Sequence, residues 1–131
     1  MKMRLERGQA LITLLFFTMI GVTVTSAAVV MILVNSTSGT KQQQGEVAYN
    51  IAQSGAENGL LRLLRDPTYT GETLSVGSGT ATITVTGSGT SSNPYIIVSK
   101  GSTGAFLREV QVTATYQSNL LTVTSRKEIY Q

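Results

Sequence analysis

A long stretch without any charged side chain, from Gly8 to Thr40, limits the folds that are open to this chain. Within it, the 25 residues 10–34 are mostly apolar. A helix of that length spans roughly 37 Å, enough to cross a hydrocarbon core of about 30 Å. Basic side chains precede the stretch (Lys2, Arg4, Arg7), and positive charge stays on the cytoplasmic side. The sequence therefore predicts a single-pass protein of the cytoplasmic (inner) membrane, with its C-terminal part outside.

Two other kinds of N-terminal segment have a similar appearance. A secretory signal peptide carries an apolar region of about 7–15 residues, followed by a cleavage site with small residues. The segment 25–28 (Thr-Ser-Ala-Ala) could serve as such a site, but the apolar run continues to Val34, which disfavours cleavage there. An ordinary uncleaved anchor that carries an extracellular β-domain for a surface ligand remains an alternative.

The composition argues against several classes of chemistry. The chain of 131 residues has a net charge of +3 and contains no Cys and no His, so it lacks the usual general base and the commonest metal ligand. Without residues 1–8 the chain has seven basic and six acidic residues, and this nearly balanced charge does not indicate nucleic-acid binding. The segments 77–80 and 87–91 are glycine-rich but lack the Gly-Lys-Ser/Thr of a phosphate loop. We expect no catalysis, no cofactor, no metal ion and no nucleic-acid partner.

The join between the basic N-terminus and the apolar stretch resembles the N-terminus of type IV prepilins and pseudopilins. It consists of a short basic segment ending in Gly8, then Gln9 and a long apolar helix. The resemblance implies that a prepilin peptidase cuts between Gly8 and Gln9 and N-methylates the new terminus. It also implies that the helix stays on the mature subunit and mediates filament assembly; the assembly positions are Leu11, Ile12, Thr13, Phe16 and Phe17.

Two residues depart from the pattern of that family. Gln9 stands where the family usually has Phe or Met, and Thr13 stands where major pilins carry the Glu that answers a neighbouring subunit's N-terminal amine. A carboxylate in hydrocarbon is costly unless it is paired, so it can set the register of assembly. In having a neutral residue there, the chain resembles PilX-like minor pilins and the tip pseudopilin of type II secretion systems. Thr13 therefore suggests an initiation or tip position.

A second segment, 48–64, is similar to the "A-x-x-A-x-[AS]-G-x-E-x-x-L" stretch of PilX-like minor pilins. Its apolar residues recur with the helical period and form one stripe. Gly55 and Gly59 lie on that stripe, where they would pack either on a neighbouring filament helix or on the chain's own sheet; the second alternative is favoured. Segment 35–40 has poor helix propensity and could break or loosen the helix, which should end at Asp66 before a proline.

The remainder is expected to form strands. Segment 80–86 alternates strictly, segments 95–99 and 106–116 are further candidates, and 74–76 and 120–123 are weaker ones. Segments 77–79, 87–89 and 101–104 have the composition of turns, and the basic pair Arg126-Lys127 is expected in a solvated tail. Arg108 falls on an apolar strand face, so it should lie near an edge or extend its charge to solvent.

These observations predict an α+β fold, in which a long N-terminal helix packs through its amphipathic half on a small antiparallel sheet. The expected divisions are a leader at 1–8, a transmembrane and assembly helix at 9–34, an amphipathic helix at 35–66 and a β head at 67–131. The resemblance implies other pilin subunits, the prepilin peptidase, an inner-membrane assembly platform and, before assembly, membrane lipid as partners. The sequence does not indicate whether the filament serves secretion, motility, adhesion or DNA uptake.

Overall fold

The computed structural model describes the backbone of residues 3–129. Helix α1 (Met3–Arg65) is followed by five strands: β1 (Gly71–Val76), β2 (Gly79–Thr86), β3 (Tyr95–Thr103), β4 (Phe106–Gln117) and β5 (Leu120–Ile129). This is the α+β architecture that the sequence predicts. The chain divides into an N-terminal unit, Met1–Thr40, and a second unit, Lys41–Gln131, which we call the head domain.

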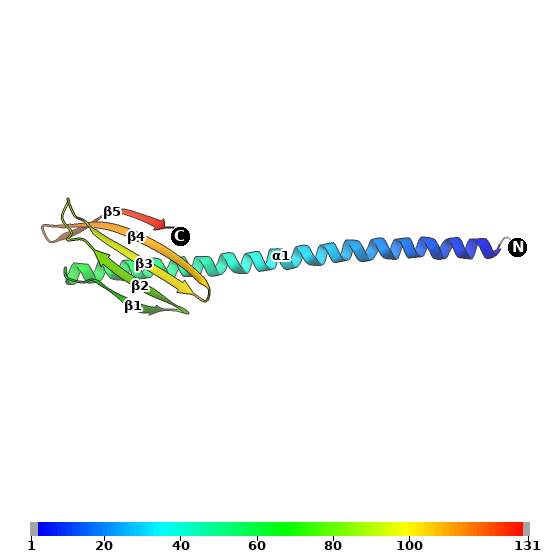
Figure 1. Cartoon of the computed structure of the whole chain (residues 1–131), viewed down its shortest axis with the longest axis horizontal. Helices are drawn as coiled ribbons and strands as arrows, with labels where there is room; N and C mark the ends of the chain where they lie inside the picture. Colours follow the sequence, from blue (N-terminus) through cyan, green and yellow to red (C-terminus); the bar gives the residue numbers. More distant parts are fainter. Residues whose placement is uncertain (1–2, 130–131) are drawn as a thin grey trace. The chain divides into compact units, whose positions relative to one another are not determined.

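The five strands form one sheet in which every strand pairs with its sequence neighbours, in the order β1-β2-β3-β4-β5, and all pairs are antiparallel (Figure 1). Three of the four connections have two residues, which can join only antiparallel neighbours, whereas residues 87–94 connect β2 to β3. The turn between β4 and β5 holds Ser118 and Asn119 at φ of 52° and 63°, as a type I′ turn requires. The Asn119 side chain accepts a hydrogen bond of 2.8 Å from the Tyr116 hydroxyl.

The core of the head domain lies between one face of the sheet and the C-terminal part of α1, which runs beside the sheet in Figure 1. Alternate residues of β2 are buried, whereas the threonines between them are exposed, as the period-two pattern predicts. The buried set combines helix and strand residues: Ala52, Ala56, Leu63, Ile83, Val85, Tyr95, Ile97, Val110 and Val112. The helix ends at Arg65, directly before the Asp66-Pro67 pair, as the sequence predicts.

Two ion pairs join α1 to the edge strands of the sheet. Arg62 contacts Glu72 of β1 at 3.1 Å, and Glu57 contacts Arg126 of β5 at 3.5 Å. Both pairs are partly exposed, so each contributes at most about 1 kcal/mol. Their positions on opposite edges orient the helix across the sheet more than they stabilise it.

Two expectations about local structure were wrong. Residues 101–103, expected in a turn, belong to β3, because cross-strand pairing with β2 and β4 extends the strand beyond its β-branched part. The pair Arg126-Lys127, expected in a solvated tail, lies in β5 opposite Val112 and Gln111. The sequence left open whether the helix breaks at residues 35–40, and α1 runs through them without a break.

Candidate functional site

The candidate site is the segment from Gly8 to Phe17 near the beginning of α1. All the predicted assembly side chains are more than half exposed: Leu11 (71%), Ile12 (57%), Phe16 (62%) and Phe17 (70%), and Thr13 is also exposed. Burying one such leucine or phenylalanine against an apolar partner stabilises by about 1.5–3 kcal/mol, so this surface demands either lipid or protein around it.

Gly8 has no packing role in the described structure. It is exposed and helical, and a Cβ added to it would meet no atom within 4 Å outside its own stretch of helix backbone. The same holds for Gly21 and Gly39 further along the helix. The fold therefore does not require glycine at position 8, and a substitution there changes the join without disturbing any described contact.

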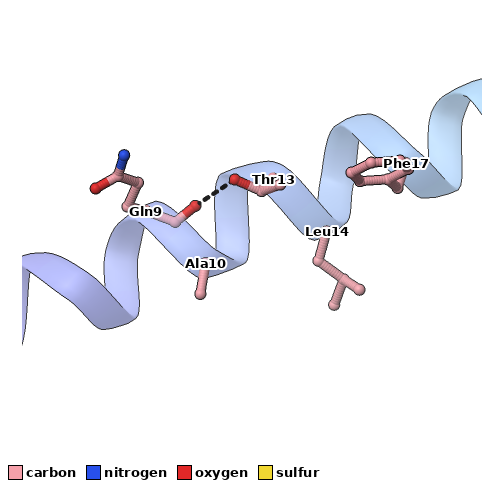
Figure 2. A pocket seen from close by; sticks show the side chains of 5 residues that line it. All are labelled: Gln9, Ala10, Thr13, Leu14 and Phe17. Carbon is pink, nitrogen blue, oxygen red and sulfur yellow. Dashed lines mark hydrogen bonds between the residues drawn. The ribbon is translucent and has the colours of Figure 1, made fainter.

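Thr13 is bonded to its own helix rather than directed outward. Figure 2 shows its hydroxyl turned back along α1, where Oγ1 donates a 2.9 Å hydrogen bond to the Gln9 carbonyl oxygen. The side-chain amide of Gln9 points away from Thr13. The hydroxyl is uncharged and already has an acceptor, so Thr13 brings neither a charge nor an unsatisfied donor into an apolar setting.

The side chains of Gln9, Ala10, Thr13, Leu14 and Phe17 border a surface hollow (Figure 2). All five come from one helix, and a single helix cannot enclose a cavity, so the hollow is an open groove between side chains. Its floor is mainly apolar, and the carbonyl of Gln9 is engaged by Thr13. Such a groove suits a ridge of side chains from another helix better than a small ligand.

The same back-bonding recurs along the apolar segment. The hydroxyls of Thr18, Thr23 and Ser26 each donate to a carbonyl oxygen three or four residues earlier, at 2.7–2.8 Å. Thr25 makes the same kind of bond to the Gly21 carbonyl. With these bonds the hydroxyls have acceptors within their own helix and need no partner outside it.

Gly55 and Gly59, the predicted helix-packing positions, lie against the sheet of the head domain. A Cβ on Gly55 would stand 2.3 Å from Ser99 Oγ and 2.7 Å from Ala81 Cβ. A Cβ on Gly59 would stand 3.1 Å from the Cγ2 atoms of both Ile83 and Ile97. The two glycines therefore allow α1 to approach β2 and β3 closely, which is the own-sheet alternative.

We call the close contact of α1 with β2 and β3 the seam. One further residue of the seam, Gly101, was not identified from the sequence. A Cβ on Gly101 of β3 would stand 2.2 Å from the Ala48 carbonyl oxygen and 2.3 Å from the Ala52 nitrogen. Gly101 continues the alternation of Ile97 and Ser99, and that pattern could have revealed it before the structure. Helix and sheet thus meet through small residues on both sides.

Arg108 ends this seam on the side nearest the start of the head domain. Its guanidinium Nη1 lies 3.0 Å from Glu128 Oε1, and its side chain is 38% exposed. A Cβ on Gly45 would stand 3.3 Å from Arg108 Nη2, so the guanidinium lies over the helix at that glycine. The side chain spans the apolar face and keeps its charge at the rim, as the sequence predicts.

Among the described residues, one helix, Gly8–Arg65, is long and apolar enough to cross a membrane. No group of three or more Asp or Glu that could hold a metal ion occurs between residues 3 and 129. No protein-family model, curated protein or solved structure matches this chain.

Proposed function

We propose that the chain is a minor pilin or pseudopilin, a structural subunit of a type IV pilus or of a type II secretion-like filament. In this proposal the prepilin peptidase removes residues 1–8, the segment 9–34 holds the subunit in the inner membrane, and the assembly platform then moves it into a filament. Its partners are other pilin subunits, and its role is structural rather than enzymatic.

The observation that carries the proposal is the composition of α1 along its length. One continuous helix begins with exposed apolar side chains and ends as a layer packed on an antiparallel sheet. An ordinary anchor needs no such continuity, because a flexible linker would serve it equally well. A filament subunit uses one helix both as membrane anchor and as packing element, and this dual use matches a helix that continues into its own head domain.

Removal of this helix from lipid has a small hydrophobic cost. Its side chains leave one apolar environment and enter another, between the helices of neighbouring subunits, so little apolar surface meets water at either stage. The back-bonded hydroxyls of Thr13, Thr18 and Thr23 need no new partners in either environment. The helix is therefore suited to both surroundings.

Thr13 supports a place at the initiation or tip end of the filament. A subunit in the body of the fibre would use a carboxylate at this position to answer a neighbour's N-terminal amine, as the resemblance implies. The Thr13 hydroxyl donates to Gln9 within its own chain and carries no charge. A subunit that has no neighbouring N-terminal amine to pair with does not need that carboxylate.

Processing tests the proposal most directly. The chain is expressed in a bacterial inner membrane with a prepilin peptidase, and the extracted protein is analysed by intact mass. We expect a mature form that begins at Gln9. The Gly8→Arg variant should keep its full length, whereas Gly39→Arg, which adds the same charge at an equally unobstructed glycine of the same helix, should be cut normally.

Two outcomes contradict the proposal in different ways. A full-length mass for the unmodified chain and for both variants would leave the uncleaved anchor with an extracellular β-domain. A mature form that starts near residue 29 would instead indicate a secretory signal peptide, and the apolar segment would then be absent from the mature protein.

A further inference from the structure

We propose that the Gln9 side chain, once cleavage after Gly8 exposes its α-amine, closes on that amine to form an N-terminal pyroglutamyl lactam. This inference rests on the proposed function, because the amine is free only after that cleavage. The mature subunit would then begin with an uncharged residue.

The need for such a step follows from the charges along α1. A new terminus at Gln9 would carry an ammonium group directly before an apolar helix, and an ammonium in an apolar setting is costly unless it is paired. The first carboxylate after Gln9 in the chain is Glu46, which belongs to the head domain. Thr13 lies one turn from the new terminus but offers only a hydroxyl, which donates its hydrogen bond to the Gln9 carbonyl oxygen.

The helix itself makes the charge less favourable still. The N-terminus of a helix carries a partial positive charge, equivalent to about half an elementary charge, so an ammonium there is repelled. A filament can place a partner subunit's carboxylate nearby, but nothing in this chain supplies one in the first turn. Loss of the charge removes both costs at once.

Glutamine is the residue that can lose this charge by its own chemistry. The unprotonated α-amine attacks the side-chain amide carbon, a new C–N bond closes a five-membered ring, and the original amide C–N bond breaks. The amine's proton leaves with the amide nitrogen as ammonia, so no oxidant, reductant or second substrate is needed. A methyl group added by the peptidase does not prevent ring closure, because the secondary amine still has one proton to give.

The local structure leaves the reacting group free to move. Gln9 is exposed, and its amide points away from Thr13 and from the apolar side chains of Leu14 and Phe17 (Figure 2). Rotation about its side-chain bonds toward the backbone nitrogen of the same residue therefore disturbs no packed neighbour.

The test uses the full chain co-expressed with a prepilin peptidase in a bacterial membrane. The mature protein is treated with formaldehyde and cyanoborohydride, which modify free amines, and its N-terminal peptide is sequenced by tandem mass spectrometry. We expect a first residue lighter than glutamine by one ammonia, with or without one added methyl group, and no labelling at its nitrogen. The matched variant Gln9→Leu has no side-chain amide and cannot form a lactam, so its form cut after residue 8 should show a labelled amine.

The outcomes separate this inference from the proposed function. A chain cut after Gly8 whose Gln9 keeps its amide and takes the label would overturn the lactam and leave the pilin proposal intact. A chain that is never cut there would overturn both. Ammonia loss at Gln9 in the parent, absent from Gln9→Leu, would establish the lactam.

Discussion

The close approach of α1 to the sheet makes a sharp prediction for Gly55→Ala. The added methyl group would lie 2.3 Å from Ser99 Oγ and 2.7 Å from Ala81 Cβ. Contacts this short force a shift of either the helix or β2 and β3, because both neighbours belong to packed strands. The variant should therefore destabilise the head domain even though alanine is the better helix former.

The magnitude follows from two opposing effects. Overpacking of a close-packed core costs about 1–3 kcal/mol, whereas replacing a mid-helix glycine by alanine returns about 1 kcal/mol. The free energy of unfolding should fall by about 1 kcal/mol, or up to about 2 kcal/mol if the helix shifts as a whole. For a domain of this size, 1 kcal/mol corresponds to a drop of roughly 4–8 °C in Tm.

Two other glycines of the same helix provide graded controls. The methyl group of Gly45→Ala would meet only the flexible guanidinium of Arg108 at 3.3 Å, so this variant should be as stable as the parent or more stable. Gly59→Ala, with contacts of 3.1 Å to two isoleucine methyl groups, should fall between the other two. The assay is urea unfolding of the detergent-solubilised full chain, followed by tyrosine fluorescence.

Equal stability of the Gly55→Ala and Gly45→Ala variants would refute the packing argument. If Gly55→Ala also abolished filament incorporation while its unfolding curve stayed unchanged, the glycine would serve contacts between subunits instead. The unfolding and assembly measurements together therefore separate the two roles.

Three further predictions concern the head domain. Gly101→Ala directs its methyl group onto the helix backbone, which cannot rotate away, so the free energy of unfolding should fall by about 3 kcal/mol or more, measured as a loss of Tm. Hydrogen bonds from the Thr68 hydroxyl and backbone N–H lower the pKa of Asp66, so its contribution to stability is present above the ordinary aspartate pKa of about 3.9 and is lost as pH falls through the lower folded value. In the Asp66→Asn variant, the free energy of unfolding should fall less steeply as pH decreases through this acid range. Burial, with Glu72 nearby, raises the pKa of Tyr69 to about 12, so a phenolate absorbance titration should show one late tyrosine that Tyr69→Phe removes.

Each of these has a control. Gly104→Ala changes a glycine with nothing within 4 Å, so its cost reflects only its φ of 55° and should be smaller than that of Gly101→Ala. If the free energy of unfolding of Asp66→Asn depended on acid pH as it does in the parent, other carboxylates would dominate acid unfolding. For Tyr69, whose stabilisation is present at pH below about 10 and lost as pH rises toward about 12, a titration with all tyrosines near 10 would contradict the burial argument.

The local sequence was sufficient for the elements whose signals are short in range. The end of α1 at Arg65 follows from the proline at 67, and strand β2 follows from its alternation of threonine with small or branched apolar residues. A helix apolar and long enough to cross a membrane was equally predictable, because an uncharged apolar run is visible in composition alone. Both kinds of signal depend on neighbours within a few positions.

The remaining features depend on partners distant in the sequence. Gly101 belongs to a strand because β2 and β4 pair with it, and its lack of a side chain has meaning only where Ala48 and Ala52 approach. Glu57 and Arg126 form an ion pair across 69 positions. Periodicity and turn chemistry are properties of a segment, whereas close approach and charge pairing are properties of two segments brought together by burial of apolar surface. That difference explains why the chain's own residues predicted an apolar helix on an antiparallel sheet and favoured Gly55 and Gly59 for that contact, whereas their partners across it were decided by the tertiary structure.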